Sequence, residues 1–476
     1  MKNFISDLIL QKLGHKPTPG QKEMIDNLAT YISDPGSASD ALFLLKGYAG
    51  TGKTSTISAL VKVLDDLKIK FVLLAPTGRA AKVLSKQSGK FASTIHKKIY
   101  RQHSGPDGSS KFSLDRNLSK NTIFIVDEAS MISNLPQDQN IFGSGYLLSD
   151  LIMYIGGGFQ CKLIIAGDTA QLPPVGLTMS PALEDSELEL FGMEVISMEL
   201  TEVVRQSVDS GILQNATFIR NRILEKPVKG FWPIKTNGFQ DVIRLGGEQL
   251  IEEISNCYRK VGMEETIVIT RSNKRANQFN EGIRKSILFQ EDQLMRGDLL
   301  MVVKNNYHWS SQIEDLDFIA NGDIAEIIRI KKHEERYGFH FANVVLRLID
   351  YDDSEIDCKI LLETLTVDAP ALTPEENKRL FDEISEDYSE IRNKRERWEK
   401  IREDPYFNAL QVKYSYAVTC HKSQGGQWKA VFLDHGYLTA EMIDREFLRW
   451  LYTAFTRAEE RLYLVNFHKD FFPETN

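Results

Sequence analysis

The chain has 476 residues, a net charge of -8, and a composition with 42% hydrophobic and 26% charged residues. At about 100–200 residues per domain, this length predicts roughly three or four globular domains. The acidic balance argues against a generic basic coat for nucleic acid, although phosphate binding depends on local patches rather than on total charge.

Neither a membrane segment nor a disulfide framework is predicted. The N-terminal apolar stretch "FISDLIL" contains Ser6 and Asp7 and has no small-residue cleavage site, so it does not resemble a signal peptide. No stretch approaches about 20 uncharged apolar residues, the length that a membrane-spanning helix needs. The absence of CxxC spacing argues against a zinc ribbon and predicts a reducing cytoplasm. The cysteines are Cys161, Cys257, Cys358 and Cys420.

Two groups of apolar runs are typical of strands buried on both faces. Helical patterns lie between the runs, so each group predicts a parallel sheet covered by helices. The first group comprises residues 41–47, 70–77, 121–130 and 161–168. The second group comprises residues 265–272, 429–436 and 461–467.

A long segment interrupts the second group. Residues 290–365 contain short strand-like runs that predict a small β-barrel. Residues 373–404 are highly charged and have apolar residues at helical spacing, with Thr373 as N-cap and Pro374 in the first turn. This helical stretch forms either a coiled-coil arm or a small hairpin packed on the barrel.

The sequence "GYAGTGKT" (47–54) matches the phosphate-binding loop G-x-x-x-x-G-K-[ST]. It follows a predicted strand and precedes a helical pattern, which is the context that the motif requires. The glycines let the backbone wrap phosphate groups, and N–H groups at the helix start bind anionic oxygen. Lys53 is expected to reach the β- and γ-phosphates, and Thr54 to bind Mg²⁺.

Carboxylates follow the next strands at their ends. Asp127 suits a Mg²⁺ ligand, and Glu128 suits the group that polarises an attacking water. After a later strand come Asp168 and Gln171. Gln171 either hydrogen-bonds the γ-phosphate or the attacking water, or belongs to an ordinary strand-to-loop turn that ends at two prolines.

Ten motifs in this order resemble those of the superfamily 1 DNA helicases, specifically the 5′-to-3′ branch, superfamily 1B, which includes RecD-like and Dda-like helicases. The resemblance covers nearly the whole chain. The motifs are "TPGQKEMI" (18–25), "GYAGTGKT" (47–54), "APTGRAAKVL" (75–84), "STIHKKI" (93–99), "DEAS" (127–130), "GDTAQLPP" (167–174), "LTEVVRQ" (200–206), "TRSNKRANQFNEGIR" (270–284), "YAVTCHKSQGGQW" (416–428) and "LYTAFTRAEERL" (451–462).

The resemblance implies an α/β fold with two RecA-like parallel-sheet P-loop domains. The first, which binds ATP, takes residues 1–97 and 121–206, with a pin-like β-hairpin inserted at 98–120. The second takes residues 207–288 and 409–476. An SH3-like β-barrel with a helical arm at about 373–404 is inserted in it at 289–408.

The resemblance also implies ATP and Mg²⁺ as cofactors. The expected metal ligands are Thr54 and Asp127. The expected catalytic residues are Lys53, Glu128, Gln171, Arg205 and Arg457, the two arginines supplying positive charge at the transferred phosphoryl group. The expected nucleotide contacts are Gln21, Gly47, Tyr48, Ala49, Gly50, Thr51, Gly52, Lys53, Thr54, Ser55, Gln171, Arg205, Gly425 and Arg457. Gln21 either reads adenine or is simply a polar residue at a helix start.

Short polar side chains and aromatic rings are expected to hold a single DNA strand. His96 is either such a contact or a helix cap. In the hairpin, Tyr100 and Phe112 flank a Gly-Pro-Asp-Gly turn; either one ring stacks on the first base pair, or both rings pack the hairpin onto its own domain. The expected DNA contacts are Thr77, Thr94, His96, Tyr100, Phe112, Asn273, Thr419, His421 and Lys422.

The adjacent Cys420 and His421 suggest a nucleophile with its base, or half of a metal site. No partner base, oxyanion site or further ligand at matching spacing accompanies them. Cys420 is therefore predicted to pack at a strand end, in a loop that senses both DNA and nucleotide.

The resemblance implies an ATP-hydrolysing DNA helicase or translocase that moves 5′-to-3′ on single-stranded DNA and unwinds duplex DNA. Alternatives are a translocase or protein-displacing motor that unwinds weakly, an RNA remodeller, and a nucleic-acid-binding regulator with an inactive ATPase fold. The expected partners are single-stranded and forked duplex DNA, with a single-strand-binding or replication protein as a further candidate. The expected form is a cytoplasmic monomer without membrane contact.

Overall fold

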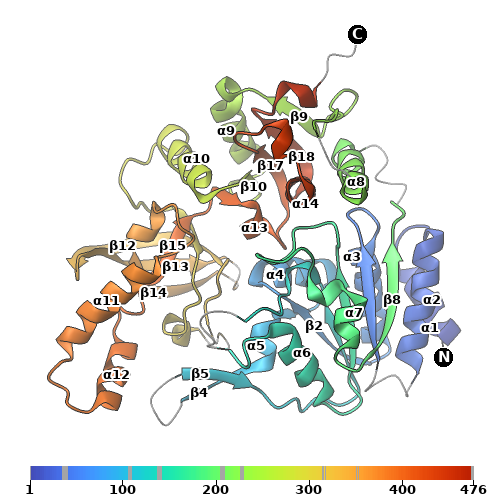
Figure 1. Ribbon diagram of the computed structural model, residues 1–476, viewed down its shortest axis with the longest axis horizontal. Coiled ribbons are helices and arrows are strands. Elements are labelled where there is room, and N and C mark those ends of the chain that lie inside the picture. The colour runs from blue at the N-terminus through green and yellow to red at the C-terminus, as the bar shows by residue number, and fades with distance from the viewer. Residues whose placement is uncertain are drawn as a thin grey trace.

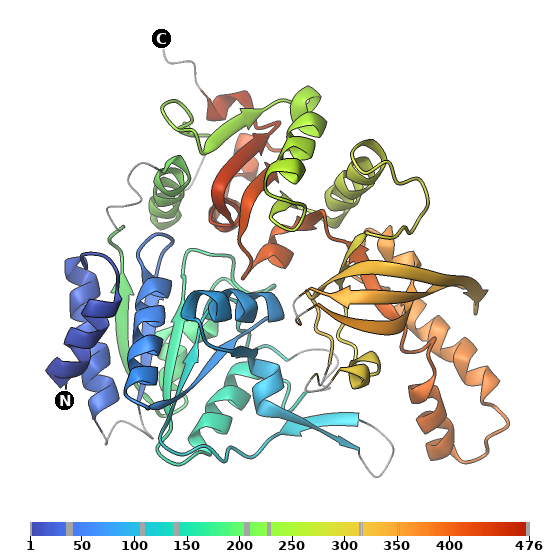
Figure 2. The same ribbon diagram turned by 180° about the vertical axis from the view of Figure 1, so that it is seen from behind.

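The computed structural model describes residues 2–34, 41–104, 110–136, 142–203, 210–225, 230–313, 316, 318–349, 351 and 353–472. These residues form two α/β units, a closed β-barrel and a β-hairpin (Figures 1 and 2). None of the helices in these ranges has the length and apolarity that a bilayer crossing needs.

The first unit contains a six-stranded sheet in which every pair of neighbours is parallel. Its strands are β3 (Ala92–Thr94), β2 (Lys70–Ala75), β6 (Thr122–Val126), β7 (Lys162–Gly167), β1 (Ala41–Gly47) and β8 (Glu194–Leu200) in spatial order.

Both faces of this sheet are covered, which explains its uninterrupted apolar strands. In β1, Phe43 and Leu45 join one core cluster, whereas Leu42 and Leu44 join the other. The first cluster is completed by α1 (Lys2–Lys12), α2 (Pro19–Ser33), α3 (Lys53–Asp66) and α4 (Gly78–Ser88). The second is completed by α5 (Ile95–Ile99), α6 (Leu147–Gly156) and α7 (Asp185–Glu189).

The second unit contains a five-stranded parallel sheet. Its strands are β16 (Ala417–Thr419), β10 (Thr266–Thr270), β17 (Trp428–Asp434), β18 (Ala458–Val465) and β9 (Val242–Leu245) in spatial order. One face packs on α9 (Leu250–Lys260) and α10 (Asn273–Ser286), and the other on α8 (Gly211–Leu224) and α14 (Arg445–Phe455). A short helix, α13 (Cys420–Ser423), follows β16.

All seven strands predicted from apolar runs are confirmed as members of these two sheets. Of the strands that were not predicted, β3, β9 and β16 have only three or four residues, and the apolar run of β8 is interrupted by Ser197 and Glu199.

The predicted β-barrel is confirmed as a closed five-stranded barrel. Its strands are β11 (Leu299–Val302), β12 (Ile324–Arg336), β13 (Phe339–Leu348), β14 (Ser354–Leu361) and β15 (Leu410–Tyr414). The last strand lies beyond residue 408, where the sequence placed the end of the insertion. β15 pairs with both β11 and β14, so it belongs to the barrel, and the chain continues directly from it into β16.

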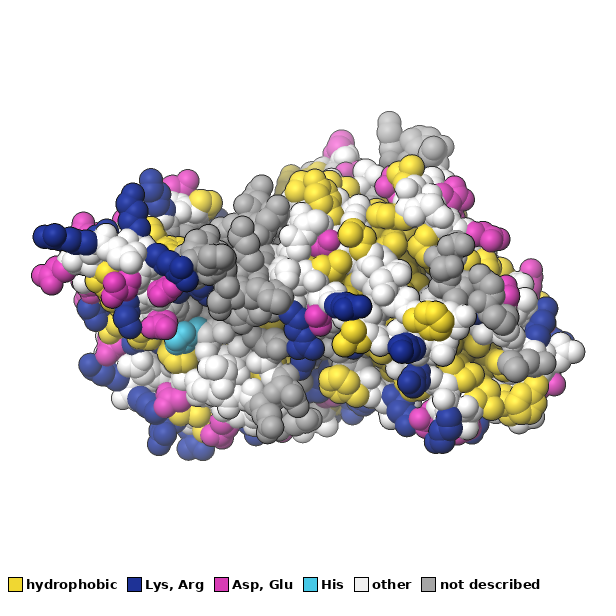
Figure 3. Space-filling view, turned by 90° about the horizontal axis from the view of Figure 1, so that it is seen from below, with side chains coloured by type: hydrophobic (Ala, Val, Ile, Leu, Met, Phe, Trp, Pro, Cys, Tyr) yellow, Lys and Arg dark blue, Asp and Glu magenta, His cyan; other side chains and the backbone are white. Residues whose placement is uncertain are grey.

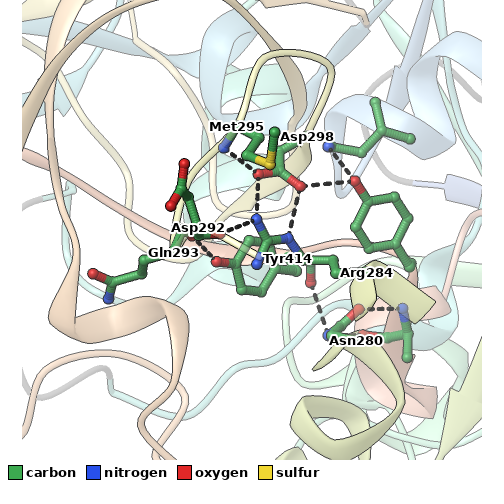
Figure 4. Close-up of polar contacts among 10 residues, drawn as sticks. Asn280, Arg284, Asp292, Gln293, Met295, Asp298 and Tyr414 are labelled. Atoms are coloured by element: carbon green, nitrogen blue, oxygen red, sulfur yellow. Dashed lines mark hydrogen bonds and ion pairs between the residues drawn. The ribbon is translucent and has the colours of Figure 1, made fainter. Parts of the chain in front are cut away.

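A buried polar network joins the barrel to α10 of the second unit (Figure 4). Arg284 donates from Nε and Nη2 to the two carboxylate oxygens of Asp298, at 2.9 and 3.0 Å. Asp298 is fully buried and also accepts from the Tyr416 hydroxyl at 3.1 Å. Asn280 donates to the carbonyl of Tyr414 at 3.2 Å. These contacts pair every oxygen of a carboxylate that would otherwise be a costly buried charge.

The charged stretch 373–404 forms two helices rather than one, α11 (Pro374–Asp387) and α12 (Lys394–Glu403). Asn393 caps the second helix by accepting two backbone N–H groups, so α12 begins anew after a turn. Leu380, Ile384 and Ile401 pack against barrel residues, which favours the packed-hairpin alternative. Seen from below, this end of the molecule carries mostly charged side chains, whereas hydrophobic ones gather over the opposite end (Figure 3).

The predicted hairpin after α5 consists of β4 (Tyr100–Ser104) and β5 (Ser110–Leu114), paired antiparallel. Residues 105–109, which contain most of the expected turn, lie outside the described residues. The hairpin projects from the first unit beside the barrel (Figures 1 and 2).

Candidate functional site

The phosphate loop connects β1 to α3 at the edge of the first sheet that faces the second unit. Gly50 and Gly52 have φ values of 75° and 80°, a left-handed conformation that glycine adopts without steric cost. Gly52 is the N-cap of α3, so the free N–H groups of the first helical turn border the loop. Lys53 begins the helix and is buried, and Thr54 and Ser55 follow in the same turn.

Two acidic residues follow β6 beside this loop. Burial raises the pKa of Asp127 to about 6, against the opposing charge of Lys53 and with a smaller contribution from Glu128. Asp127 Oδ1 accepts the Glu128 N–H at 2.8 Å. Glu128 has a φ of 55°, which is unusual for a non-glycine residue, and its buried Oε2 has no hydrogen-bond partner within the described ranges.

These residues fit a magnesium ion. Thr54 and Asp127 supply hard oxygen donors, and Glu128, which has an unpartnered oxygen, directly follows Asp127 in sequence. Among the described residues, no group of three or more His, Cys, Asp or Glu side chains is arranged to hold a metal. Proteins usually hold Mg²⁺ through one or two carboxylates together with substrate phosphates and water, and Asp127 with Thr54 can supply such protein ligands.

A tyrosine from the second unit joins the phosphate loop to the loop after β7. The Tyr452 hydroxyl accepts the Ala49 N–H at 2.8 Å and donates to Asp168 Oδ2 at 2.7 Å. Asp168 Oδ1 accepts the Ala170 N–H at 2.9 Å, and burial raises the pKa of Asp168 against the charge of Lys53. Asp168 is thus hydrogen-bonded across the interface between the units.

Neighbouring residues of α14 hold the same loop. Arg449 donates from Nη1 to the carbonyls of Thr169 and Gln171, at 2.7 and 3.0 Å. Thr453 Oγ1 accepts the Leu172 N–H at 2.8 Å. Sequence reasoning missed Arg449, Tyr452 and Thr453, although their spacing puts all three on one face of a helix. The buried Gln171 amide accepts a long 3.5 Å hydrogen bond from Ser130.

Two arginines, Arg205 and Arg457, were predicted to supply positive charge at the transferred phosphoryl group. Arg205 lies outside the described residues. The guanidinium of Arg457 is buried within its own unit, where it donates to the carbonyls of Thr453 and Gly426 at 3.1 Å each. In this conformation the guanidinium of Arg457 therefore bonds groups of its own unit, and its expected contact with the phosphates stays a prediction.

Gln21 was expected either to read adenine or to be a polar residue at a helix start. Its side chain is fully buried and forms a capping box with Thr18 at the start of α2. Its Nε2 donates to the Thr51 carbonyl at 2.9 Å. The side-chain amide thus bonds both the helix cap and the phosphate loop, which fits the alternative of a polar residue at a helix start, while a contact with adenine stays a prediction.

Gly425 was expected to contact nucleotide, and this contact stays a prediction, since the structure shows only how the glycine packs. With a φ of 72°, it packs so tightly against α4 that an added Cβ would lie 2.7 Å from the Ala80 Cβ. Tyr48, by contrast, remains in the phosphate loop, where its hydroxyl donates to Glu199 at 2.6 Å and its ring lies under Arg220 of α8.

A cavity of about 720 Å³ lies where the two units and the barrel meet. The first unit contributes Thr77, Thr94 and His96, and the second contributes His421 and Lys422, so five predicted DNA contacts come together. The barrel contributes residues that no motif indicated: Lys304, Asn305 and Asn321.

The polar groups of this cavity suit a phosphate backbone. Thr77 and Thr94 cap α4 and α5 by accepting backbone N–H groups, which leaves each hydroxyl proton free to donate. Burial lowers the pKa of Lys422 to about 8, with a contribution from the nearby charge of Lys413. Burial also lowers the pKa of His96 to about 4, so His96 is neutral near pH 7.

Four other predicted contacts do not line the cavity. Thr419 caps α13, and Asn273 opens α10. Tyr100 and Phe112 are buried, so neither ring is exposed for stacking on DNA. Tyr100 donates to Asp150 at 2.7 Å. The alternative in which both rings pack the hairpin onto protein therefore fits the structure.

The rings at the hairpin base also contact the barrel. The Phe112 ring lies 4.6 Å from that of Tyr307, and the Phe142 ring lies 5.9 Å from that of Phe318. His96 lies 4.9 Å from Phe142 in an edge-on arrangement. This aromatic cluster links the first unit to the barrel along one wall of the cavity.

The loop that contains Cys420 touches both sites. Gln424 lines the cavity and donates to the Leu172 carbonyl at 2.7 Å, one residue from Gln171. Cys420 is buried, its thiol donates to the Trp450 carbonyl, and burial raises its pKa to about 12. A thiol with so high a pKa is not a nucleophile at neutral pH.

Models of two known families match the chain. A model described as an AAA domain matches residues 17–222, and a model described as the UvrD-like helicase C-terminal domain matches residues 414–465. The first match includes the phosphate loop, and the second includes the Cys420 loop and α14.

Several curated proteins are similar over long stretches. An uncharacterized protein of Acanthamoeba polyphaga mimivirus is 26% identical, over 88% of this chain and 94% of its own. The ATP-dependent RecD2 DNA helicase of Deinococcus radiodurans is 24% identical, over 94% of this chain and 50% of its own. The ATP-dependent DNA helicase dda of Enterobacteria phage T4 is 27% identical, over 54% of this chain and 55% of its own. The chain thus spans about half the length of these two helicases.

Solved structures also align with most of the chain. The Pif1 helicase from Bacteroides in complex with ADP-AlF3 and ssDNA aligns over 96% of this chain and 94% of its own, with a TM-score of 0.46 and 15% identity. The Pif1 helicase from Candida albicans aligns over 95% of both chains, with a TM-score of 0.45 and 16% identity.

Proposed function

We propose that this chain is an ATP-dependent DNA helicase of superfamily 1B, a proposal supported by the matches to an AAA domain and to the UvrD-like helicase C-terminal domain and by the similarity to the RecD2 and dda helicases. It binds ATP between its two α/β units, moves 5′-to-3′ along single-stranded DNA and unwinds duplex DNA ahead of it. The barrel is the SH3-like insertion of this branch, and the hairpin is its pin.

One observation carries the proposal: the loop at Gln424 lines the cavity and also hydrogen-bonds beside Gln171. A strand in the cavity and a nucleotide at the phosphate loop would therefore act on the same short segment. Such shared contacts are what coupling between two ligands requires, because each ligand must change the free energy of binding of the other.

The chain's residues have distinct roles in hydrolysis. Lys53 and the N–H groups of the loop bind the β- and γ-phosphates, and Glu128 orients the attacking water. Thr54 and Asp127 would hold Mg²⁺, which when bound would neutralise charge on the transferred phosphoryl group. Arg449 is a second-unit cation that contacts the loop after β7, since its Nη1 donates to the carbonyls of Thr169 and Gln171. Arg205 and Arg457 are the arginines proposed to stabilise charge on the transferred phosphoryl group.

On DNA, the hydroxyls of Thr77 and Thr94 bind phosphate from the first unit, while His421 and Lys422 bind it from the second. ATP binding closes the cleft and hydrolysis reopens it, so the two sets of contacts grip the strand alternately. A helicase monomer is sufficient for this cycle.

Two experiments test the function. Lys53→Ala is expected to abolish ATPase activity stimulated by single-stranded DNA; turnover close to that of the parent protein would contradict the assignment. Unwinding of a duplex with a 5′ tail is then compared with a 3′-tailed and a blunt duplex. Only the 5′-tailed duplex is expected to open, and strand separation from a 3′ tail would contradict the proposed direction.

A further inference from the structure

A second cavity, of about 570 Å³, lies between the outer flank of the first unit and the barrel. It adjoins the 720 Å³ cavity, since Thr94, Phe318 and Ala320 line both. The two cavities therefore lie side by side at Thr94, close enough for one strand to occupy both.

An exposed aromatic ring stands at this second cavity. Phe91 lies in the loop between α4 and β3 and lines the cavity, with 79% of its surface exposed. An apolar ring left in water forgoes the free energy of burial, so a ligand that covers it gains stability. Three residues farther along the chain is Thr94, the capping residue that borders both cavities.

The charges of the cavity favour an anionic strand. Lys82 of α4 and Lys97 of α5 line the first-unit side, together with Ser93. The Lys82 ammonium donates to the carbonyl of Ile349, which holds this lysine at the rim next to the barrel. Asp353 lines the cavity from the barrel side, so the cationic wall is the one that carries Phe91.

We propose that this cavity continues the DNA path and that Phe91 stacks on a base of the single strand that passes Thr94. The inference rests on the proposed function and extends its binding site. Proteins that hold single strands without regard to sequence combine such a cationic groove with aromatic platforms.

The test measures binding of fluorescently labelled DNA strands of increasing length by anisotropy. Because stacking of one base on an aromatic ring contributes measurably to affinity, Phe91→Ala is expected to weaken the binding of long strands by about tenfold. Strands too short to extend beyond the 720 Å³ cavity are expected to bind both proteins equally. Phe91→Tyr keeps the ring and is expected to restore parental affinity at every length.

Phe289→Ala is the matched control, because Phe289 is also 79% exposed and lines neither cavity. Equal affinity of Phe91→Ala and parent at every length would overturn the proposal and leave Phe91 as a contact for a protein partner. An equal loss in Phe289→Ala would overturn it as well. If the parent protein binds no single-stranded DNA at any length, the proposed function itself fails, which is a separate result.

Discussion

Replacing Tyr452 with Phe removes one oxygen atom from the interface between the two α/β units. The side chain is only 1% exposed, and the ring keeps its neighbours in the core of the second unit. The substitution deletes two hydrogen bonds across the interface, from the Ala49 N–H at 2.8 Å and to Asp168 at 2.7 Å.

The size of the effect follows from the two bonds. A neutral hydrogen bond contributes about 0.5–1.5 kcal/mol and one to a charged group about 1.5–3 kcal/mol, so the nucleotide-free interface loses about 2–4 kcal/mol. The Ala49 N–H belongs to the phosphate loop, where a bound phosphate competes with the tyrosine hydroxyl for it. In Tyr452→Phe the Ala49 N–H has no partner in the nucleotide-free protein, which raises the free energy of that state, whereas a bound phosphate pairs the N–H in both proteins. Nucleotide is therefore expected to bind the variant about 5- to 30-fold more tightly.

The measurement is equilibrium binding of a slowly hydrolysed ATP analogue to the parent protein and to Tyr452→Phe, with and without single-stranded DNA. Without DNA the variant is expected to bind the analogue more tightly, and its ATPase activity is expected to be less stimulated by DNA. Tyr31→Phe is the control, because that buried hydroxyl bonds the carbonyls of Ala41 and Leu163 inside the first unit and crosses no interface. Unchanged or weaker binding by Tyr452→Phe, or the same change in both variants, would refute the reasoning.

Three further predictions concern the joint, the cavity and the buried thiol. Asp298→Ala leaves the Arg284 guanidinium buried and unpaired, so chemical denaturation is expected to show a loss of about 3–5 kcal/mol; a loss below about 1 kcal/mol contradicts this. The pKa of Lys422 is about 8, so its charge is lost as pH rises from 7 to 9. Single-stranded DNA should then bind more weakly, and Lys422→Arg should flatten the profile; identical profiles argue against the contact. Cys420→Ser is expected to keep ATPase activity within about twofold, because serine can still donate to the Trp450 carbonyl; a large loss would reopen a chemical role for the thiol.

The sequence predicted those features that depend on neighbouring residues. Strands buried on both faces are visible in the sequence as continuous apolar runs. The phosphate loop is visible as a motif because its left-handed positions, Gly50 and Gly52, favour glycine. The carboxylates that follow such strands lie at one edge of the sheet, so Asp127 and Asp168 could be placed near Lys53 from order alone.

Contacts that arise from packing between distant segments could not be predicted in this way. Tyr452 meets Ala49 across 403 residues, and no local pattern encodes that distance. The direction of a long side chain is also decided by its surroundings, so Gln21 and Arg457 stand in the expected motifs but donate to backbone carbonyls. The barrel residues of the cavity lie on loops without a periodic pattern and gave no signal.

The paired charges of Arg284 and Asp298 have a mechanical consequence. They reinforce a junction that the chain already crosses twice, between α10 and β11 and between β15 and β16. A rotation of the second unit is therefore expected to move the barrel and its two-helix arm along with it, against the aromatic contacts that join the barrel to the first unit. The arm lies far from the cleft (Figure 1). A small rotation that closes the cleft would therefore displace the arm over a longer distance than it displaces residues near the cleft. With one fluorescent dye on α12 and a second on the first unit, energy transfer between the dyes would report the closing of the cleft.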